Sequence, residues 1–301
     1  MSNGTKESNV LTALDIAKKS EGNESDVQTP FALQVGGRAP FINLSGDHLL
    51  KTCDKREVHF YKHMPEEMRL VTPVCCASIQ EHILTPLDNC CTKCTVDELG
   101  NISRFVVEPR QLDLMSNYVI IADMTHGMRL PCVLDIKLGT RTHGDAAPPE
   151  KVQRMMEMCL KTTSASLGIR LCGMKHFDEN GDEIVVGKTG GRAMDEAALT
   201  EAIHLFFKPC PQAVDEVMRR VKEIKSVLLG IPGLRLFGSS LLIALEANPH
   251  VGDTPSDLAR VCIIDFAKAT FPGHLQDKVY EGVDGGLIMG FDSVNRILSN
   301  I

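Results

Sequence analysis

Residues 131–139 read PCVLDIKLG, a stretch of the form P-x-x-x-D-x-K-x-G, and the chain continues as TRTHGD to residue 145. The residues before Asp135 are apolar and favour a buried strand. Because alternate side chains of a strand point to the same face, Asp135 and Lys137 share a face. A carboxylate and an ammonium group there can bind a sugar hydroxyl and a phosphate in one cleft, although a surface ion pair gives the same pattern. Gly139 would let the backbone turn or a ligand approach closely.

The composition is that of a globular protein. The chain has 301 residues, 43% hydrophobic and 24% charged, enough for one two-lobed domain or two small ones. No apolar run reaches the length of a membrane span, and the polar N-terminus lacks the apolar core of a signal peptide, so we expect a cytoplasmic or nuclear protein. The net charge of −7 argues against general nucleic-acid binding but permits a local basic patch for an anionic substrate.

The 11 cysteines fit a reducing compartment, where most would be buried thiols. Five of them cluster in the sequence: Cys75, Cys76, Cys90, Cys91 and Cys94. Cys91 and Cys94 form a C-x-x-C pair, which is typical of zinc sites. The first two are adjacent, however, and adjacent residues of a regular strand point to opposite faces. Free thiols in an insertion loop are therefore the expectation, with zinc as the alternative.

The pattern of apolar residues predicts a tail without stable structure at 1–28, then a strand-rich part, then mixed strands and helices. Strands are expected at 31–38, 41–44, 49–51, 116–121, 169–177, 183–186, 235–246 and 260–266. Helices are expected at 56–64, 148–160, 195–207, 212–229 and 293–298. Residues 122–128 read as a connector between the two parts.

Three further stretches carry residues suited to phosphate or metal chemistry. Asp265 is a single acid in the apolar run IIDFA at 263–267, and burying it costs several kcal/mol unless it is paired or bound to a metal ion. Lys51 follows two leucines on an expected strand. Ser240 lies in LFGSSLL at 236–242, where small hydroxylated residues can face phosphates or support Asp265.

These motifs together resemble the inositol polyphosphate kinases over nearly all of residues 30–301. The continuation K-x-G-T-R-x-H-G-D is most similar to the inositol hexakisphosphate kinases. The resemblance implies an α+β, two-lobed fold like those of ATP-grasp enzymes and protein kinases, with antiparallel sheets in both lobes. It places an N-lobe for the nucleotide phosphates at 29–123 and a C-lobe at 124–301, with a short helical segment for the inositol phosphate at about 145–166.

The resemblance also implies roles for individual residues. Lys51 would contact the ATP phosphates, Asp265 would bind Mg²⁺, and Lys137 would bridge the acceptor and the transferred phosphoryl group. Adenine would meet the backbone at Ala122 and Met124, and the nucleotide site would include Asp135, Ser240 and Asp265. The residues implied for the inositol phosphate are Lys137, Arg141, His143, Lys151, Arg154, Lys161 and Lys188. Lys151 and Arg154 are three apart and share a helical face.

The activity implied is transfer of the γ-phosphoryl group of ATP, with Mg²⁺, to a phosphate of inositol hexakisphosphate, giving a diphosphoinositol phosphate. One alternative is a multikinase or a trisphosphate kinase acting on a ring hydroxyl. The short segment between Gly139 and Arg170 argues against the larger inositol-binding lobe of the trisphosphate kinases. Another is a catalytically weak scaffold, because Arg38, Ala122 and Lys268 depart from the family pattern. The expected partner is the inositol polyphosphate, with neither nucleic acid nor membrane.

Overall fold

A computed structural model of the protein describes residues 33–35, 41–44, 47–81, 83–88, 90–91, 116–178 and 180–301. The predicted tail at 1–28, the Gly36-Gly37-Arg38 stretch and Cys94 lie outside these residues. The described residues form two compact units. The first holds those between 39 and 58 and between 74 and 123, and the second holds those between 32 and 38, between 59 and 73, and from 124 onward.

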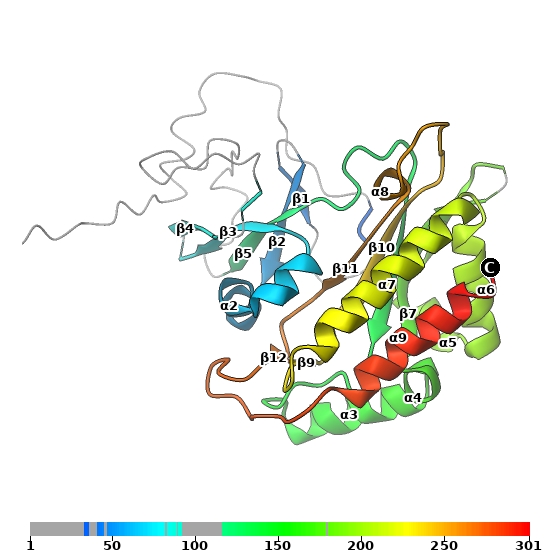
Figure 1. Ribbon diagram of the computed structural model, residues 1–301. Coiled ribbons are helices and arrows are strands. Elements are labelled where there is room, and N and C mark those ends of the chain that lie inside the picture. The colour runs from blue at the N-terminus through cyan, green and yellow to red at the C-terminus, as the bar shows by residue number, and fades with distance from the viewer. Residues whose placement is uncertain are drawn as a thin grey trace, which may run out of the picture. The chain divides into compact units, whose positions relative to one another are not determined.

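The first unit is an antiparallel five-stranded sheet with the order β1-β2-β5-β3-β4 (Figure 1). Its strands are β1 (Ile42–Asn43), β2 (His48–Cys53), β3 (Cys75–Gln80), β4 (Ile83–Pro86) and β5 (Asn117–Ala122). Leu50, Ile79 and Ile120 lie in its hydrophobic core. Helix α2 (Lys55–His63) follows β2, and the carboxylate of Asp54 accepts a 2.9 Å hydrogen bond from the N–H of Glu57 in its first turn. The helix begins in the first unit and ends in the second.

The second unit contains an antiparallel sheet with the order β11-β10-β6-β7-β8. These strands are β6 (Pro131–Leu138), β7 (Ile169–Phe177), β8 (Glu183–Val186), β10 (Ser240–Glu246) and β11 (Ala259–Ile264), and β9 (Arg235–Leu236) pairs separately with β12 (Ala269–Thr270). The central strand β6 buries Leu134, Ile136 and Leu138 completely on one face. The alternation of a strand therefore leaves Asp135 and Lys137 on the other face.

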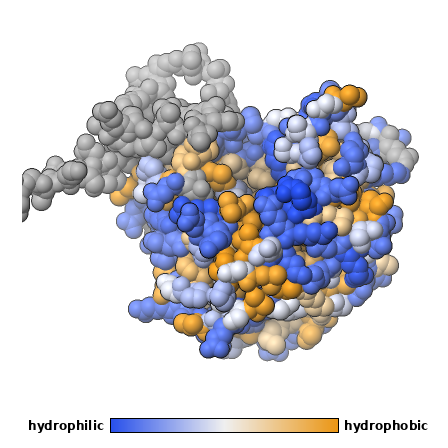
Figure 2. All heavy atoms as spheres, in the orientation of Figure 1, coloured by the Kyte–Doolittle hydropathy of each residue, from blue (hydrophilic) through white to orange (hydrophobic). Residues whose placement is uncertain are grey.

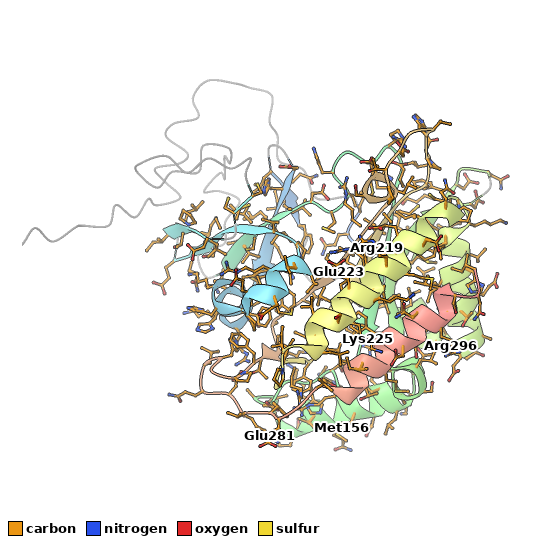
Figure 3. All side chains as sticks on the ribbon, viewed as in Figure 1. Met156, Arg219, Glu223, Lys225, Glu281 and Arg296 are labelled. Atoms are coloured by element: carbon orange, nitrogen blue, oxygen red, sulfur yellow. The ribbon has the colours of Figure 1, made fainter. Side chains whose placement is uncertain are left out.

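Helices α6 (Glu196–Phe207), α7 (Val214–Leu229) and α9 (Gly285–Leu298) pack on the larger sheet of this unit, with α7 and α9 side by side (Figure 1). Lys225 on α7 forms an ion pair with Asp292 on α9. A guanidinium nitrogen of Arg219 lies 3.0 Å from the Oε2 atom of Glu223 on the outward side of α7 (Figure 3). Hydrophilic side chains cover most of this face (Figure 2). The remaining helices are α3 (Pro149–Leu160), α4 (Thr163–Leu167), α5 (Lys188–Ala193), α8 (Pro255–Leu258) and the 3₁₀ turns η1 (Glu66–Leu70) and η3 (Pro211–Ala213).

The α+β class and the antiparallel sheets agree with the sequence, and the predicted strands at 169–177 and 183–186 have the observed bounds. The single strand predicted at 235–246 is wrong. It divides into β9 and β10 at a turn where Gly238 has a φ of 76°. A backbone with positive φ cannot continue a ladder, and glycine adopts it without steric cost.

The terminal helix is longer than its predicted bounds of 293–298 and starts at Gly285. The sequence did not indicate this start, because the helix opens with two glycines, which oppose helix formation in isolation. Asp284 caps its start by accepting from the N–H groups of Gly286 and Leu287. Gly286 lies so close to Thr140 that a Cβ atom would be 2.3 Å from the threonine hydroxyl oxygen. Close packing, which no local pattern shows, therefore requires this glycine.

No helix in the described part of the chain is both long enough and apolar enough to cross a lipid bilayer.

Candidate functional site

Lys137 and Asp265 meet in the second unit. Strand β10 lies between β6 and β11, and Ser240 pairs with Lys137 on one side and with Ile264, next to Asp265, on the other. The Lys137 Nζ lies 3.3 Å from Asp265 Oδ2 and donates a 2.7 Å hydrogen bond to the carbonyl of Gly238. The D-x-K motif and the IDFA motif, which are 128 residues apart, thus form one site.

Asp265 has an unusual backbone. Its φ of 68° lies in the left-handed region, which few residues other than glycine, asparagine and aspartate adopt. The Ser239 hydroxyl donates a 2.6 Å hydrogen bond to the Asp265 carbonyl and helps to hold this conformation. The predicted supporting role of the serine pair is therefore seen at Ser239. Such locally unfavourable conformations cluster at functional sites.

Asp135 is 3% exposed, and its Oδ1 accepts no hydrogen bond from the described residues. Burial raises the pKa of this carboxyl group and the charge of Asp265 adds to the effect, while the Lys137 ammonium opposes it. Burial alone would lower the pKa of Lys137, but Asp265 and Asp135 together hold it above its ordinary value. Lys137 is thus a fixed cation between two carboxylates. The buried hydroxyl of Ser240 lies beside Asp135 and acts to lower the pKa of that carboxyl group.

The candidates in the first unit are Lys51 and Ala122. The Lys51 ammonium lies 2.7 Å from Glu57 Oε1, and both side chains are buried. A buried lysine–glutamate pair of this kind holds the phosphate-binding lysine of protein kinases in place. Lys51 was a candidate from the sequence, but Glu57 was not predicted to be its partner. The contact joins strand β2 to helix α2, and the pattern within either element does not show it.

Ala122 and Met124 flank the point at which the chain leaves the first unit. The N–H of Ala122 donates to the Val74 carbonyl, and the Met124 carbonyl accepts from Arg260. Any adenine contact here would use the remaining backbone groups.

Arg141 and His143 are already engaged within the protein. The guanidinium of Arg141 lies 4.0 Å from the centre of the Phe237 ring and donates to Tyr280 and Asp145. Burial, with the charge of Arg141, lowers the pKa of His143, which favours its neutral form. Arg141 therefore also supports the fold of the loop that follows the D-x-K motif. Lys268 donates a 2.8 Å hydrogen bond to the Thr142 carbonyl.

Helix α3 carries Lys151, which is half-buried, and Arg154, which is exposed, and Lys161 is its C-terminal cap residue. None of these three side chains makes a hydrogen bond or ion pair with another described residue, so their charges are available to an anion. Val152, Met156 and Leu160 line a shallow apolar groove on the same helix. The residues that line the groove include no cation. Lys188 is the first residue of α5. Its positive charge acts to lower the pKa of the Cys172 thiol on β7, which burial raises.

Arg170 was missed from the sequence. It pairs in register with Lys137 on the neighbouring strand, so the two side chains share a face of the sheet. It is 6% exposed and donates to the Ser164 hydroxyl at 2.9 Å, and no described carboxylate pairs with it. Arg170 is a single charged residue between the apolar residues Ile169 and Leu171. Asp265 was identified by the same kind of pattern, so this pattern could also have identified Arg170.

A divalent cation fits the residues present. The side chain of Asp265 is 34% exposed, and its Oδ2 alone contacts Lys137. Mg²⁺ in kinases binds one or two carboxylate oxygens together with substrate phosphates. Asp265 can supply such an oxygen.

A model of the inositol polyphosphate kinase family matches residues 118–299 of the chain. The chain is similar to inositol hexakisphosphate kinase 3 of Mus musculus, with 31% identity over 205 residues, covering 63% of the chain and 52% of the relative. It is similar to inositol hexakisphosphate kinase 1 of Rattus norvegicus, with 28% identity, covering 61% of the chain and 51% of the relative. The chain thus spans about half the length of these relatives.

Among solved structures, the inositol phosphate multikinase Ipk2 of S. cerevisiae, in complex with ADP and Mn²⁺, shares the fold. The TM-score is 0.61 at 22% identity, over 85% of this chain and 99% of that one.

Proposed function

The chain belongs to the inositol polyphosphate kinase family, and from this premise we propose that it transfers the γ-phosphoryl group of ATP to a phosphate of inositol hexakisphosphate. The product is a diphosphoinositol phosphate. The observation that carries the proposal is the ammonium of Lys137, held 3.3 Å from Asp265 and also stabilised by the charge of Asp135. Two motifs far apart in the sequence supply the cation and the carboxylate that phosphoryl transfer requires.

Lys137 acts where negative charge accumulates. The acceptor phosphate and the transferred phosphoryl group repel each other as they approach, and a fixed cation between them lowers that repulsion. Because Asp265 and Gly238 already orient the Lys137 ammonium, little reorganisation is needed during the reaction.

Lys51, oriented by Glu57, contacts the donor phosphates. Asp265 holds Mg²⁺ through its partly exposed carboxylate, and the ion offsets the negative charge of the donor phosphates. Asp135, with a buried oxygen that accepts no hydrogen bond from the described residues, and Ser240 beside it are assigned to the nucleotide. The remaining backbone groups of Ala122 and Met124 are assigned to adenine. The multikinase of similar fold, solved with ADP and Mn²⁺, supports both cofactor assignments.

The acceptor site is cationic. Lys151 and Arg154 on α3 are its first candidates because their charges have no partner among the described residues. Lys161, Lys188 and Arg170 are assigned to it as well, and Arg141 and His143 contribute chiefly by shaping the loop after β6. A phosphate acceptor is ionised at neutral pH, so transfer to it requires no strong general base, in contrast to transfer to a hydroxyl.

The acceptor can be tested directly, because inositol hexakisphosphate has no free hydroxyl. The protein is incubated with Mg-ATP and either inositol hexakisphosphate or a trisphosphate or tetrakisphosphate, and the products are separated by charge. A product of inositol hexakisphosphate with one more phosphate, absent with Asp265→Asn, is the expected result. Turnover only of acceptors with free hydroxyls would assign the chain to the multikinase or trisphosphate kinase type. Turnover of none would favour a scaffold.

A further inference from the structure

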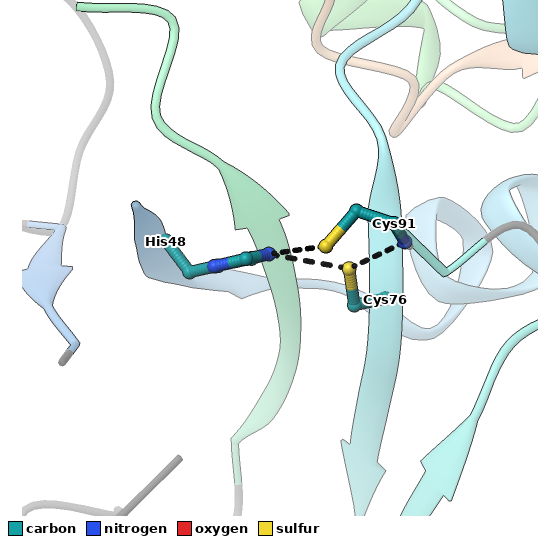
Figure 4. A group of neighbouring side chains, drawn as sticks. All are labelled: His48, Cys76 and Cys91. Atoms are coloured by element: carbon teal, nitrogen blue, oxygen red, sulfur yellow. Dashed lines mark hydrogen bonds between the residues drawn. The ribbon is translucent and has the colours of Figure 1, made fainter. Parts of the chain in front are cut away.

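A second cluster of reactive side chains lies in the first unit, apart from the residues assigned to phosphoryl transfer. His48 on β2, Cys76 on β3 and Cys91 after β4 converge, with their ligand atoms within 4.8 Å of one another (Figure 4). The His48 Nε2 lies 3.3 Å from the Cys76 sulfur and 3.5 Å from the Cys91 sulfur. His48 and Cys76 are buried.

The strand geometry brings one cysteine of each adjacent pair into the cluster. The pairing of β3 with β5 shifts register between Cys75 and Ala77, so Cys76 is the extra residue of a bulge. A bulge re-aims the side chain that it carries, so the opposite-face rule of a regular strand does not apply to Cys76. The histidine, 28 residues earlier in the chain, completes a set that the cysteine spacing alone did not reveal.

Ordinary hydrogen bonding accounts for only part of this arrangement, in which the Cys76 sulfur accepts a 3.4 Å hydrogen bond from the Cys91 N–H (Figure 4). The Nδ1 of His48 lies 2.9 Å from the Asp47 carboxylate, a close electrostatic contact without the geometry of a hydrogen bond. The Nε2 of His48 offers one proton or one lone pair, depending on the tautomer, yet two sulfur atoms lie beside it. One lone pair cannot accept well from two thiols, whereas one cation can bind the nitrogen and both sulfurs.

We propose that His48, Cys76 and Cys91 bind a zinc ion. Zinc–nitrogen bonds of about 2.0–2.1 Å and zinc–sulfur bonds of about 2.3 Å at tetrahedral angles place nitrogen and sulfur roughly 3.5 Å apart. Both observed nitrogen–sulfur distances are near this value. Two thiolates and an imidazole are ligands that zinc prefers, and a carboxylate near the second ring nitrogen, here Asp47, is common beside a zinc-bound histidine. The three ligands leave one tetrahedral position for a further donor.

The ion would join two strands of the sheet that are not neighbours. Strand β5 lies between β2 and β3, so an ion bound by both His48 and Cys76 would link β2 to β3 across β5, beside Ala122 at the end of β5. Cys91 ties the segment after β4 to the same point. Because the unfolded chain lacks the site, metal binding stabilises the folded first unit. The role is structural, since none of the residues assigned to phosphoryl transfer is a ligand.

The test measures the metal content of the full-length protein, purified under reducing conditions with zinc present and dialysed. About one equivalent of zinc per chain is expected for the wild type. Cys76→Ser, Cys91→Ser and His48→Gln should each lose most of it. Cys53→Ser, which changes a thiol at the other end of β2, is the matched control and should retain it. A wild type without zinc, or three variants that keep it, would overturn the proposal.

Two measurements on the wild type decide the matter even if the variants fail to fold. Cobalt added to the metal-free protein should give the intense near-ultraviolet absorption of cobalt–thiolate bonds, and zinc should remove it by competition. A chelator should lower the wild-type melting temperature, with recovery on adding zinc. Absence of cobalt–thiolate absorption, or a disulfide between Cys76 and Cys91 in the reduced preparation, would refute the site.

Discussion

Asp265 adopts a left-handed backbone conformation and presents a partly exposed carboxylate, which makes asparagine a clean replacement. Asparagine tolerates the same φ, so Asp265→Asn should fold normally. Losing the charge that holds the metal should cost several kcal/mol in the transition state, a fall in kcat on the order of 10²–10³-fold. Steady-state kinetics with Mg-ATP, beside a thermal melt, measures this. Near-normal turnover by the folded variant would exclude Asp265 as the metal ligand.

Lys137 should matter more to the transition state than to nucleotide binding. Its ammonium is fixed near Asp265, where the repulsion between phosphates peaks only during transfer. Lys137→Ala should therefore lower kcat by about 10²-fold or more, with a much smaller rise in the KM for ATP. Lys225→Ala, which removes an ion-paired lysine from α7, is the control and should leave both constants nearly unchanged. A pure KM effect would make Lys137 a ground-state binder.

At the scale of an element, α3 offers two cations on one face. Replacing Lys151 and Arg154 together with alanine should raise the KM for the inositol phosphate about tenfold and leave the KM for ATP nearly unchanged. Two partly exposed charge pairs contribute about 1.4 kcal/mol in total, which corresponds to that factor. Added salt should weaken acceptor binding by the wild type more than by the variant.

The control is Arg219→Ala with Lys222→Ala, a pair with the same three-residue spacing on α7. Loss of ATP affinity in the α3 variant, or an unchanged KM for the acceptor, would show that α3 is only a solvated helix. The acceptor would then be sought around Lys188 and Arg170.

Helix α9 depends on close packing at its first turn. Gly286→Ala would put a Cβ atom 2.3 Å from the Thr140 hydroxyl, so it should destabilise the protein by about 1–3 kcal/mol. Gly285→Ala, one residue earlier, meets nothing within 4 Å and should be neutral or slightly stabilising. Denaturant unfolding of both variants provides the comparison. Equal stabilities would show that α9 shifts to accommodate the methyl group.

At the scale of the whole molecule, Asp135 links stability to pH. Because its pKa is raised in the folded state, the folded chain binds this proton more readily than the unfolded chain, and stability falls as pH rises through that interval. Asp135→Asn removes this penalty. The variant should therefore unfold at a higher temperature than the wild type at neutral pH, with lower activity, and the difference should shrink as pH falls below the ordinary carboxyl pKa.

Glu67→Gln, which removes an exposed carboxylate, controls for the change in net charge. Its melting temperature should stay close to that of the wild type at every pH. An Asp135→Asn variant less stable than the wild type at every pH would mean that the ionised carboxylate stabilises the fold through Lys137.

The sequence by itself determined most strands and helices and the residues of the two central motifs, while the α+β class came from the resemblance to the family. These features depend on local patterns: a period of two along β6, a helical period along α7, and single charges in apolar runs at Asp135, Lys137 and Asp265. The resemblance to the family rested on the same short stretches, and the family match over 118–299 confirmed it.

Only the tertiary structure decided which distant residues meet. Glu57 beside Lys51, Arg170 beside Lys137, and His48 between Cys76 and Cys91 are contacts that no local pattern specifies. The start of α9 depended likewise on the close approach of Gly286 to Thr140. Local periodicity fixes the face on which a side chain lies, but its partner across the sheet is set by packing among residues far apart in the chain.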